Sequence, residues 1–554
     1  MSFPRPYCLL RWIVFFFFIA SILLLIFLAG SSTAAIQGDY REHTFFLKDS
    51  FLLNVLICII LLCVSWVGHV LVLRLEKWDY RRINVEKLGI LAVFAISAFW
   101  ALLTQPGLIS DQASIQESAA QLSYGDLTPL LEEGYCARYP HQLGAVFFSI
   151  IFQGIFGRNN LICYQLINAA LCALCYKEII CIAKHTLFKN TMSAELLALG
   201  LLFYPILLYS TFVYPMIPSF YFSLLSFRYL SSYLEDGIKK GLIKGVSAMV
   251  LAIVLKPNAL VFLIALVLIS AIGGYGKRSF TATIILVLFS ILALLLPRHI
   301  AENIFHVKMP EGISPWSYLA MGMQEGERAP GWYNGYINEN YTNSEYDGIK
   351  QKENAIVQIR KRIGEFKTSP QEAVRFYLRK IASEWNNPTF EAFWIHEVRP
   401  KNITLATWVK RLTRVTGAQL LAVPLNYLQF FILVGALLFG ILVLPSAGPI
   451  LLLFPLTFVG GMLFHLIWEA KCQYTIIYFT LLLPCSILGI HAFFERIQTA
   501  NRRERIKRGT VAVLIFLLIG SMALVLPNRE IISGDEEQFK QYLEEYREGK
   551  KIQK

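Results

Sequence analysis

The chain has 554 residues, of which 56% are hydrophobic and only 16% are charged. This composition excludes an ordinary soluble domain, because the apolar residues come in blocks of about twenty, the length of a membrane-crossing helix. The net charge of +13 would suit nucleic-acid binding, but the basic residues gather in short loops between apolar blocks. Cytoplasmic loops of membrane proteins have this pattern, so no nucleic-acid partner is expected.

The apolar blocks predict an all-α polytopic membrane protein with about thirteen spans. The first block follows Arg5 and Arg11, and we expect a retained helix with a cytoplasmic N-terminus rather than a signal peptide. Basic loops after residues 73 and 494 mark the cytoplasmic face. The expected spans are 13–30, 51–73, 88–104, 143–157, 161–183, 195–212, 214–232, 241–272, 279–297, 424–444, 447–468, 474–494 and 510–526.

This count divides the chain into five parts. Residues 1–87 hold two N-terminal helices and a basic loop, and 88–297 form a core with an amphipathic outer loop at 105–142. Residues 298–422 are polar and long enough for a small extracytoplasmic α-rich domain. The parts 423–526 and 527–554 are C-terminal helices and a charged outer tail. The count leaves Lys184, Lys189, Lys239 and Lys240 outside, which fits the charge rule poorly.

The cysteines do not indicate a disulfide framework. Most of the ten lie in apolar segments, and Cys136 is the one that the pattern places in a water-facing loop. Cys172 and Cys175 form a CxxC inside an apolar helix without a second pair, so packing is favoured over metal binding.

Asp111 is the best catalytic candidate. It follows the third predicted span, in a loop with five acids and one arginine that is too long for a plain connector. A carboxylate at the membrane surface can accept a proton from an attacking hydroxyl. The alternative is a capping acid, since Ser110 and Asp111 begin a predicted short helix that runs to Gln121. Asp126 lies in the turn-like SYGDLTP and is expected to be a turn or cap residue.

Several cations are candidates for holding a phosphate. Lys256 and Pro257 interrupt an apolar stretch, where a lysine is costly unless it faces a partner or a wet cavity. Arg138 and His141 precede the fourth span, and Arg298 follows the ninth. Lys471 lies in HLIWEAKCQY between two apolar runs. For Arg138 and His141 the alternative is an interfacial anchor whose charge reaches the lipid head groups, and for Lys256 it is a snorkelling lysine where two short helices meet. For Lys471 the alternative is a structural pair with Glu469.

Aromatic residues in the polar segment suit stacking on sugar rings or packing on the membrane surface. Trp316, Trp332 and Tyr333 lie in PWSYLAMGMQEGERAPGWYNGYINENY, and WNNPTFEAFW is a second aromatic stretch. Together with Glu469 of HLIWEAKCQY they are candidates for binding acceptor or sugar.

Residues 88–526 resemble the GT-C superfamily of membrane glycosyltransferases. The similarity rests on SDQ at Asp111, YPHQLG, LKPNAL, AMGMQEGERAPGWYNGY and FHLIWEAKCQY, and it is strongest to cell-wall-related members of Gram-positive bacteria. The resemblance implies a polyprenyl-phosphate sugar donor, a site on the extracytoplasmic face of the plasma membrane and inversion at the anomeric carbon. It assigns the base role to Asp111 and matches Lys256 to a lysine that precedes proline or glycine. Many members have two adjacent acids where this chain has Asp111 and Gln112, which leaves a metal open.

The implied function is transfer of a sugar from undecaprenyl phosphate to a cell-surface glycan, with no cofactor beyond the lipid-linked sugar. Membrane lipids and the glycan acceptor are the expected partners. Two alternatives stay open: a polymerase or ligase that uses a diphosphate-linked oligosaccharide, and a flippase or transporter. The first would need more arginine and histidine for two phosphates, and the second would need charge pairs along a central path.

Overall fold

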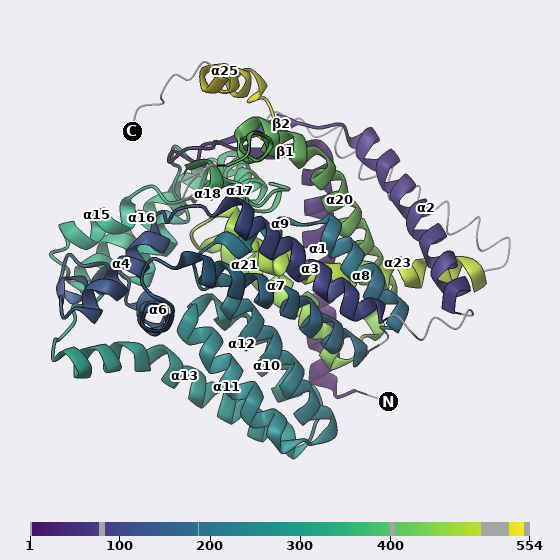
Figure 1. Ribbon diagram of the computed structural model, residues 1–554, viewed down its shortest axis with the longest axis horizontal. Coiled ribbons are helices and arrows are strands. Elements are labelled where there is room, and N and C mark those ends of the chain that lie inside the picture. Colours follow the sequence, from purple (N-terminus) through teal and green to yellow (C-terminus); the bar gives the residue numbers. More distant parts are fainter. Residues whose placement is uncertain (1–2, 77–83, 187, 399–404, 500–530, 548–554) are drawn as a thin grey trace.

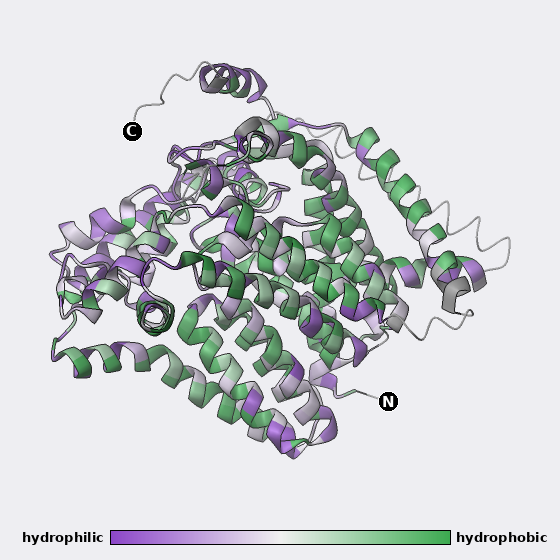
Figure 2. Ribbon diagram, in the orientation of Figure 1, coloured by the Kyte–Doolittle hydropathy of each residue, from purple (hydrophilic) through white to green (hydrophobic). Residues whose placement is uncertain are grey.

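The computed structural model describes residues 3–76, 84–186, 188–398, 405–499 and 531–547. They form a helical bundle with one small sheet (Figure 1). Hydrophobic residues dominate the long helices, whereas hydrophilic residues gather at helix ends and in the segment that follows α13 (Figure 2). The predicted class, an all-α membrane protein, is therefore confirmed at this level.

Seven helices of the described chain are long and apolar enough to cross a membrane. They are α1 (Arg5–Ser31), α2 (Phe51–Glu76), α3 (Val85–Thr104), α7 (Leu161–Lys184), α13 (Lys277–Phe305), α20 (Val415–Leu442) and α21 (Pro449–Ile467). The short η5 (Leu444–Ser446) joins the last two.

Two further spans are broken by bends. One comprises α8 (Asn190–Leu202), α9 (Pro205–Leu208) and η3 (Tyr209–Thr211), with a 65° bend at Pro205. The other comprises α22 (Cys472–Thr480) and α23 (Leu482–Thr499), with a bend of 42°. They raise the number of membrane-capable helices to nine among the described residues, so these do not reach the predicted thirteen. The predicted span 510–526 lies outside the described residues.

The predicted span 143–157 needs correction. Its helix, α6 (Leu143–Phe156), is about 21 Å long and lies across the bundle, so Figure 1 shows it end-on. Both its ends stay at one end of the bundle. Gln142, just before it, donates to Tyr214 at 3.0 Å, and Arg158, just after it, pairs with Glu117 of α4 (Asp111–Ser123) at 2.7 Å. We call this the α4 end.

The predicted single span 241–272 is a hairpin of two helices. α11 (Lys239–Leu255) follows α10 (Met216–Asp236), and the chain then turns at Lys256 and η4 (Pro257–Ala259) into α12 (Leu260–Ile272). Pro257 cannot continue α11, which forces the break. Arg278, shortly after α12, donates to the backbone of Glu235 at 2.7 Å, so α12 returns to the end where α11 starts.

The correction to α6 changes the end at which the four conflicting lysines are expected to lie. Lys184 pairs at 2.5 Å with Glu86, in the first turn of α3, and His185 lies 3.3 Å from Glu235. Lys184 and the start of α11 therefore lie at the end opposite to the α4 end, together with the start of α3. The charge-rule conflict of the sequence count arose because that count treated α6 as a crossing, and all four lysines follow α6 in the chain. The α11–α12 hairpin then places the segment after α13 at the α4 end.

A β-hairpin joins α1 to α2, which the sequence did not indicate. Strands β1 (Ser32–Ile36) and β2 (Thr44–Lys48) pair antiparallel, with Ser32 opposite Lys48. The C-terminal helix α25 (Glu536–Arg547) packs on this hairpin, where Phe539 and Tyr542 contact Phe45. The hairpin loop and the described part of the tail thus lie at the α4 end.

The polar segment after α13 contains short helices that are partly inserted into the bundle. They are α14 (Pro315–Met321), α15 (Tyr336–Asn343), α16 (Gly348–Thr368), α17 (Pro370–Trp385), α18 (Trp394–Val398) and α19 (Thr407–Thr413). α17 is amphipathic, and Trp385 at its end packs edge-on against Phe458 of α21 with ring centroids 5.5 Å apart. The connection from α4 to α6 holds η1 (Thr128–Leu130), α5 (Tyr135–Arg138) and η2 (Pro140–Gln142).

Candidate functional site

A cavity of about 330 Å³ opens at the α4 end. Segments far apart in the sequence form its wall: the hairpin loop, the start of α4, the turn before α12, the polar segment and the α21–α22 connection. It is lined by Tyr40, Glu42, Ile109, Ser110, Asp111, Gln112, Tyr139, His141, Gln142, Phe212, Tyr214, Lys256, Pro257, Asn258, Tyr318, Arg328, Trp332, Tyr333, Ile337, Trp394, Trp468, Glu469, Lys471, Gln473 and Tyr474.

Asp111 is the first residue of α4 and lines this cavity. Burial raises the pKa of Asp111, while the Tyr135 hydroxyl, Lys256 and Lys471 act in the opposite direction. Ser110 before it has a left-handed φ of 51°, a conformation that non-glycine residues rarely adopt. A carboxylate with a raised pKa is a better proton acceptor near neutral pH than an ordinary one.

Gln112 has a structural role at the position where a second acid would stand. Its side chain is buried, and its Oε1 accepts a 3.0 Å hydrogen bond from the backbone N–H of Val213. This bond ties the start of α4 to the loop that carries Tyr214. The amide supplies no second carboxylate beside Asp111.

Lys256 extends into the cavity from the break between α11 and α12. It is 8% exposed, and its Nζ lies 4.2 Å from the ring centroid of Tyr214 and 5.3 Å from that of Tyr474. No carboxylate of the described chain lies within ion-pair distance of it. A buried ammonium held only by aromatic faces retains the capacity to bind an anion.

Glu469 lies between α21 and α22 and lines the same cavity. Burial, followed by the charge of Asp111, raises the pKa of Glu469 to about 7. Lys471, Arg328 and Lys256 counteract this rise only in part. The negative charge of Asp111 therefore makes Glu469 easier to protonate, so that Glu469 can exchange a proton near neutral pH.

Lys471, predicted as a phosphate ligand, is already neutralised. It forms an ion pair with Glu42 of the hairpin loop, and Glu391 Oε1 lies 3.9 Å from its Nζ. Glu42 also pairs with Arg328 and is almost fully buried. We call Glu42, Arg328, Glu391 and Lys471 the charge cluster. It forms one wall of the cavity and ties the hairpin to the polar segment and to α22.

Aromatic rings form another wall. Tyr318 and Trp468 stack with centroids 5.4 Å apart and planes 8° apart. Lys380 of α17 donates to the backbone carbonyl of Trp468 at 2.7 Å and thereby fixes this pair. Tyr333 lines the cavity and accepts a 2.8 Å hydrogen bond from Asn338. Trp332 lines it too but is buried, with its indole donating to Ser383, so little of its face is free for stacking.

Three predicted site residues lie elsewhere. Arg298 is occupied by Glu302 at 3.1 Å and by the Met309 carbonyl at 2.6 Å. Trp316 is on the surface, with Lys352 over its ring, and Arg138 lies near Tyr341. None of the three lines the cavity. The predicted residues that do line it are Asp111, His141, Lys256, Trp332, Tyr333, Glu469 and Lys471.

Sequence reasoning missed Glu42, Arg328, Glu391 and Tyr214. Arg328 and Glu391 stand inside the two aromatic stretches, so the signal for them was charge within a polar, aromatic segment. Glu42 follows the first helix and gave no comparable signal. Nothing in the sequence indicated that this helix connection folds over the site.

A second, larger cavity of about 820 Å³ lies between α4 and the start of α7. Gln116, Glu117, Arg158 and Gln165 line it, as does Tyr135, the tyrosine beside Asp111. Asp111, which lines the first cavity, is thus hydrogen-bonded to a tyrosine that lines the second. Comparison of the chain with family models, with curated proteins and with solved structures gave no match.

Proposed function

We propose that this protein is a membrane glycosyltransferase that moves a sugar from a polyprenyl phosphate onto a cell-surface glycan at the outer face of the plasma membrane. The observation that carries the proposal is the convergence of Asp111, Glu469 and the unpaired Lys256 on one cavity at the α4 end. The resemblance to GT-C enzymes supplies the reaction class.

The proposed reaction is a single displacement. The acceptor hydroxyl attacks the anomeric carbon, its proton passes to Asp111, and the bond from that carbon to the phosphate oxygen breaks. The leaving phosphate gains one negative charge as it departs. Lys256 balances that charge, and a preorganised cation in a dry site is among the largest contributions to catalysis.

The two hollows suit the two substrates. The 330 Å³ cavity contains Lys256 and the stacked Tyr318–Trp468 pair, which fit the phosphate and the sugar of the donor. The 820 Å³ hollow beyond Tyr135 suits a glycan, because amides and one ion pair supply hydrogen-bonding groups beside apolar residues such as Leu108 and Leu161.

The test is sugar transfer in isolated membranes with radiolabelled undecaprenyl-phosphate sugars. We expect label to move from the lipid fraction to a water-soluble glycan, and Asp111→Asn to reduce the rate by about 100-fold or more, because an amide cannot take the proton. Asp126→Asn is the matched control, since Asp126 lies in the same loop but is exposed, does not line the 330 Å³ cavity and accepts hydrogen bonds from Thr128 in its own turn.

Three results would count against the proposal. Full activity in Asp111→Asn would remove this residue from the reaction. Absence of transfer from every monophosphate donor, with transfer from a diphosphate-linked oligosaccharide, would favour a polymerase or ligase. Movement of labelled lipid across the membrane without transfer would favour a flippase.

A further inference from the structure

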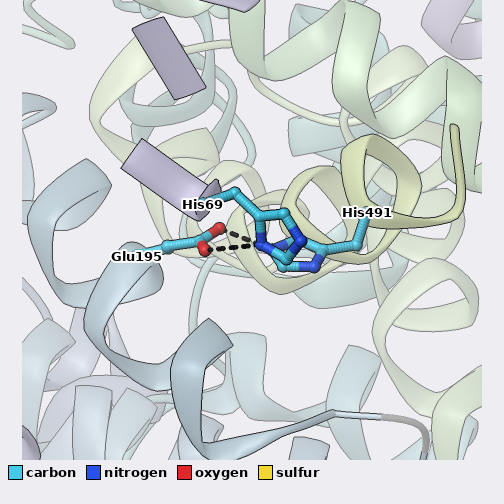
Figure 3. Close-up of side chains that lie close together, drawn as sticks. All are labelled: His69, Glu195 and His491. Carbon is cyan, nitrogen blue, oxygen red and sulfur yellow. Dashed lines mark hydrogen bonds and ion pairs between the residues drawn. The ribbon is translucent and has the colours of Figure 1, made fainter. Parts of the chain in front are cut away.

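Three side chains that the proposed function does not use meet at the end opposite to the cavity. They are His69 near the end of α2, Glu195 in α8 and His491 in α23 (Figure 3). The three helices are separated widely in sequence. Their closest ligand atoms, one from each side chain, all lie within 4.8 Å of one another.

The geometry is that of a metal site. Glu195 Oε2 lies 2.6 Å from His491 Nε2, and Glu195 Oε1 lies 3.7 Å from His69 Nδ1. Tetrahedral zinc with bonds of about 2.0–2.1 Å separates its ligand atoms by about 3.4 Å, a value between these two distances. The imidazole rings cross edge-to-face with centroids 4.5 Å apart, so both present nitrogen toward the carboxylate.

Unsatisfied atoms point to a missing ligand. His69 Nδ1 and Glu195 Oε1 are both buried, yet neither has a hydrogen-bond partner in the described chain. A buried nitrogen and a buried carboxylate oxygen left unpaired are costly, because neither regains the hydrogen bonds that it makes to water in the unfolded chain. A cation bound between them would satisfy both atoms at once.

We propose that His69, Glu195 and His491 bind a divalent first-row transition ion such as Zn²⁺. Two imidazole nitrogens and one carboxylate oxygen are ligands that suit this ion, and three protein ligands leave a fourth position for water. The described residues contribute no fourth His, Cys, Asp or Glu to the group.

The ion would attach α2 to the bundle. α2 is the least covered of the seven membrane-capable helices, and Figure 1 shows it at the edge of the molecule. Near His69, Trp66 of α2 packs edge-on against Phe494 of α23, with ring centroids 4.8 Å apart. Metal binding between three helices is a strong constraint at such a weakly packed contact.

The experiment is metal analysis of the full chain, purified in detergent through an affinity tag without histidine. After equilibration with buffered Zn²⁺ and removal of free metal, we expect about one zinc per chain, and less than about a tenth of that in His69→Ala and His491→Ala. His185→Ala is the matched control, because His185 pairs with Glu235 at the same end without a second histidine. Size-exclusion profiles verify that each variant is folded.

Cobalt gives a measurement that needs no variant. Replacement of the ion by Co²⁺ in the wild-type chain should produce the visible absorption of a four-coordinate site, and Zn²⁺ should abolish it. Wild-type protein that retains no zinc and shows no cobalt spectrum would overturn the proposal. Equal zinc in wild type and both histidine variants would also overturn it.

Discussion

At the scale of single residues, the two lysines that line the cavity differ in the groups that surround their charges. Lys471 belongs to the charge cluster, whereas Lys256 lies against tyrosine rings with no carboxylate of the described chain within 4.0 Å. Burying a cation without a carboxylate partner is costly, so a lysine buried in this way indicates a ligand-binding position. We therefore assign the phosphate to Lys256 and a structural role to Lys471, although both are lysines at one cavity.

This assignment predicts that lysine-to-methionine substitution impairs sugar transfer at Lys256 and folding stability at Lys471. Lys256→Met should lower the rate of sugar transfer by about 10- to 1,000-fold and leave thermal stability nearly unchanged, because Lys256 forms no ion pair with a carboxylate of the described chain. Lys471→Met should lower the free energy of unfolding by about 2 kcal/mol or more, because it removes one counter-charge from Glu42 and Glu391. Transfer assays and thermal unfolding in detergent measure both. Equal loss of stability in the two variants would contradict the assignment.

The raised pKa of Glu391 predicts that the stability of the folded protein depends on pH. Burial raises the pKa of Glu391 from 4.5 to about 7, and Lys471 offsets this only in part. The folded protein therefore keeps a proton that the unfolded chain releases, so the stabilisation is complete below pH 4.5 and is lost as pH rises through about 7. We expect Glu391→Gln to raise the melting temperature at pH 8 and to have little effect at pH 5. A gain at pH 5 that equals the gain at pH 8 would exclude this mechanism.

The residues that sequence reasoning placed at the site share one property. Asp111, Lys256 and Glu469 are charged residues beside or between apolar runs, where charge is costly and therefore informative. Arg298 and Arg138 have the same property, but local partners account for them. Glu42 could not be found this way, because its importance depends on a hairpin that folds over a surface formed by residues 280 to 430 positions later.

At the scale of elements, helix length and the positions of prolines explain which predicted membrane spans match helices of the structure. The long helices α1, α2, α3, α7, α13, α20 and α21 match predicted spans, because an uninterrupted apolar run of such length has one stable arrangement in a membrane. α6 and the α11–α12 hairpin did not follow the prediction. Hydropathy reports apolar content, and it does not report whether a short helix crosses the bundle or lies across it.

The contact between α6 and α11 predicts a contrast between two glycines of one helix. A Cβ on Gly144 would lie 1.8 Å from the backbone oxygen of Val254, two residues before Lys256, whereas Gly154 has open space around it. Gly144→Ala should therefore separate α6 from α11, lower stability by about 1–3 kcal/mol and reduce transfer.

Gly154→Ala serves as the control for this contrast. It should be neutral or stabilise by up to about 1 kcal/mol, because alanine favours the helix and meets nothing there. Thermal unfolding and transfer are measured for both variants. A Gly144→Ala protein as stable and active as the Gly154→Ala protein would show that this contact does not position Lys256.

At the scale of the whole molecule, the two ends of the bundle have different chemistry. The α4 end holds both cavities, the hairpin loop and α25. The opposite end holds the Lys184–Glu86 pair, Lys239, Lys240 and the proposed metal group. The lysines near the opposite end fit a cytoplasmic face under the charge rule, which the sequence count did not achieve. A donor linked to polyprenyl phosphate would then be met at the outer face.

This orientation predicts the outcome of cysteine labelling in intact cells. Tyr124, at the end of α4, is 81% exposed, and Lys240, in the first turn of α11, is exposed at the opposite end. In a chain whose exposed Cys63 is replaced by serine, a membrane-impermeant maleimide should label Tyr124→Cys in intact cells. It should label Lys240→Cys only after the cells are permeabilised. Labelling of Lys240→Cys alone in intact cells would place the cavity in the cytoplasm and contradict an extracytoplasmic transfer reaction, whereas the metal proposal would stand, because it depends on three helices and not on their orientation.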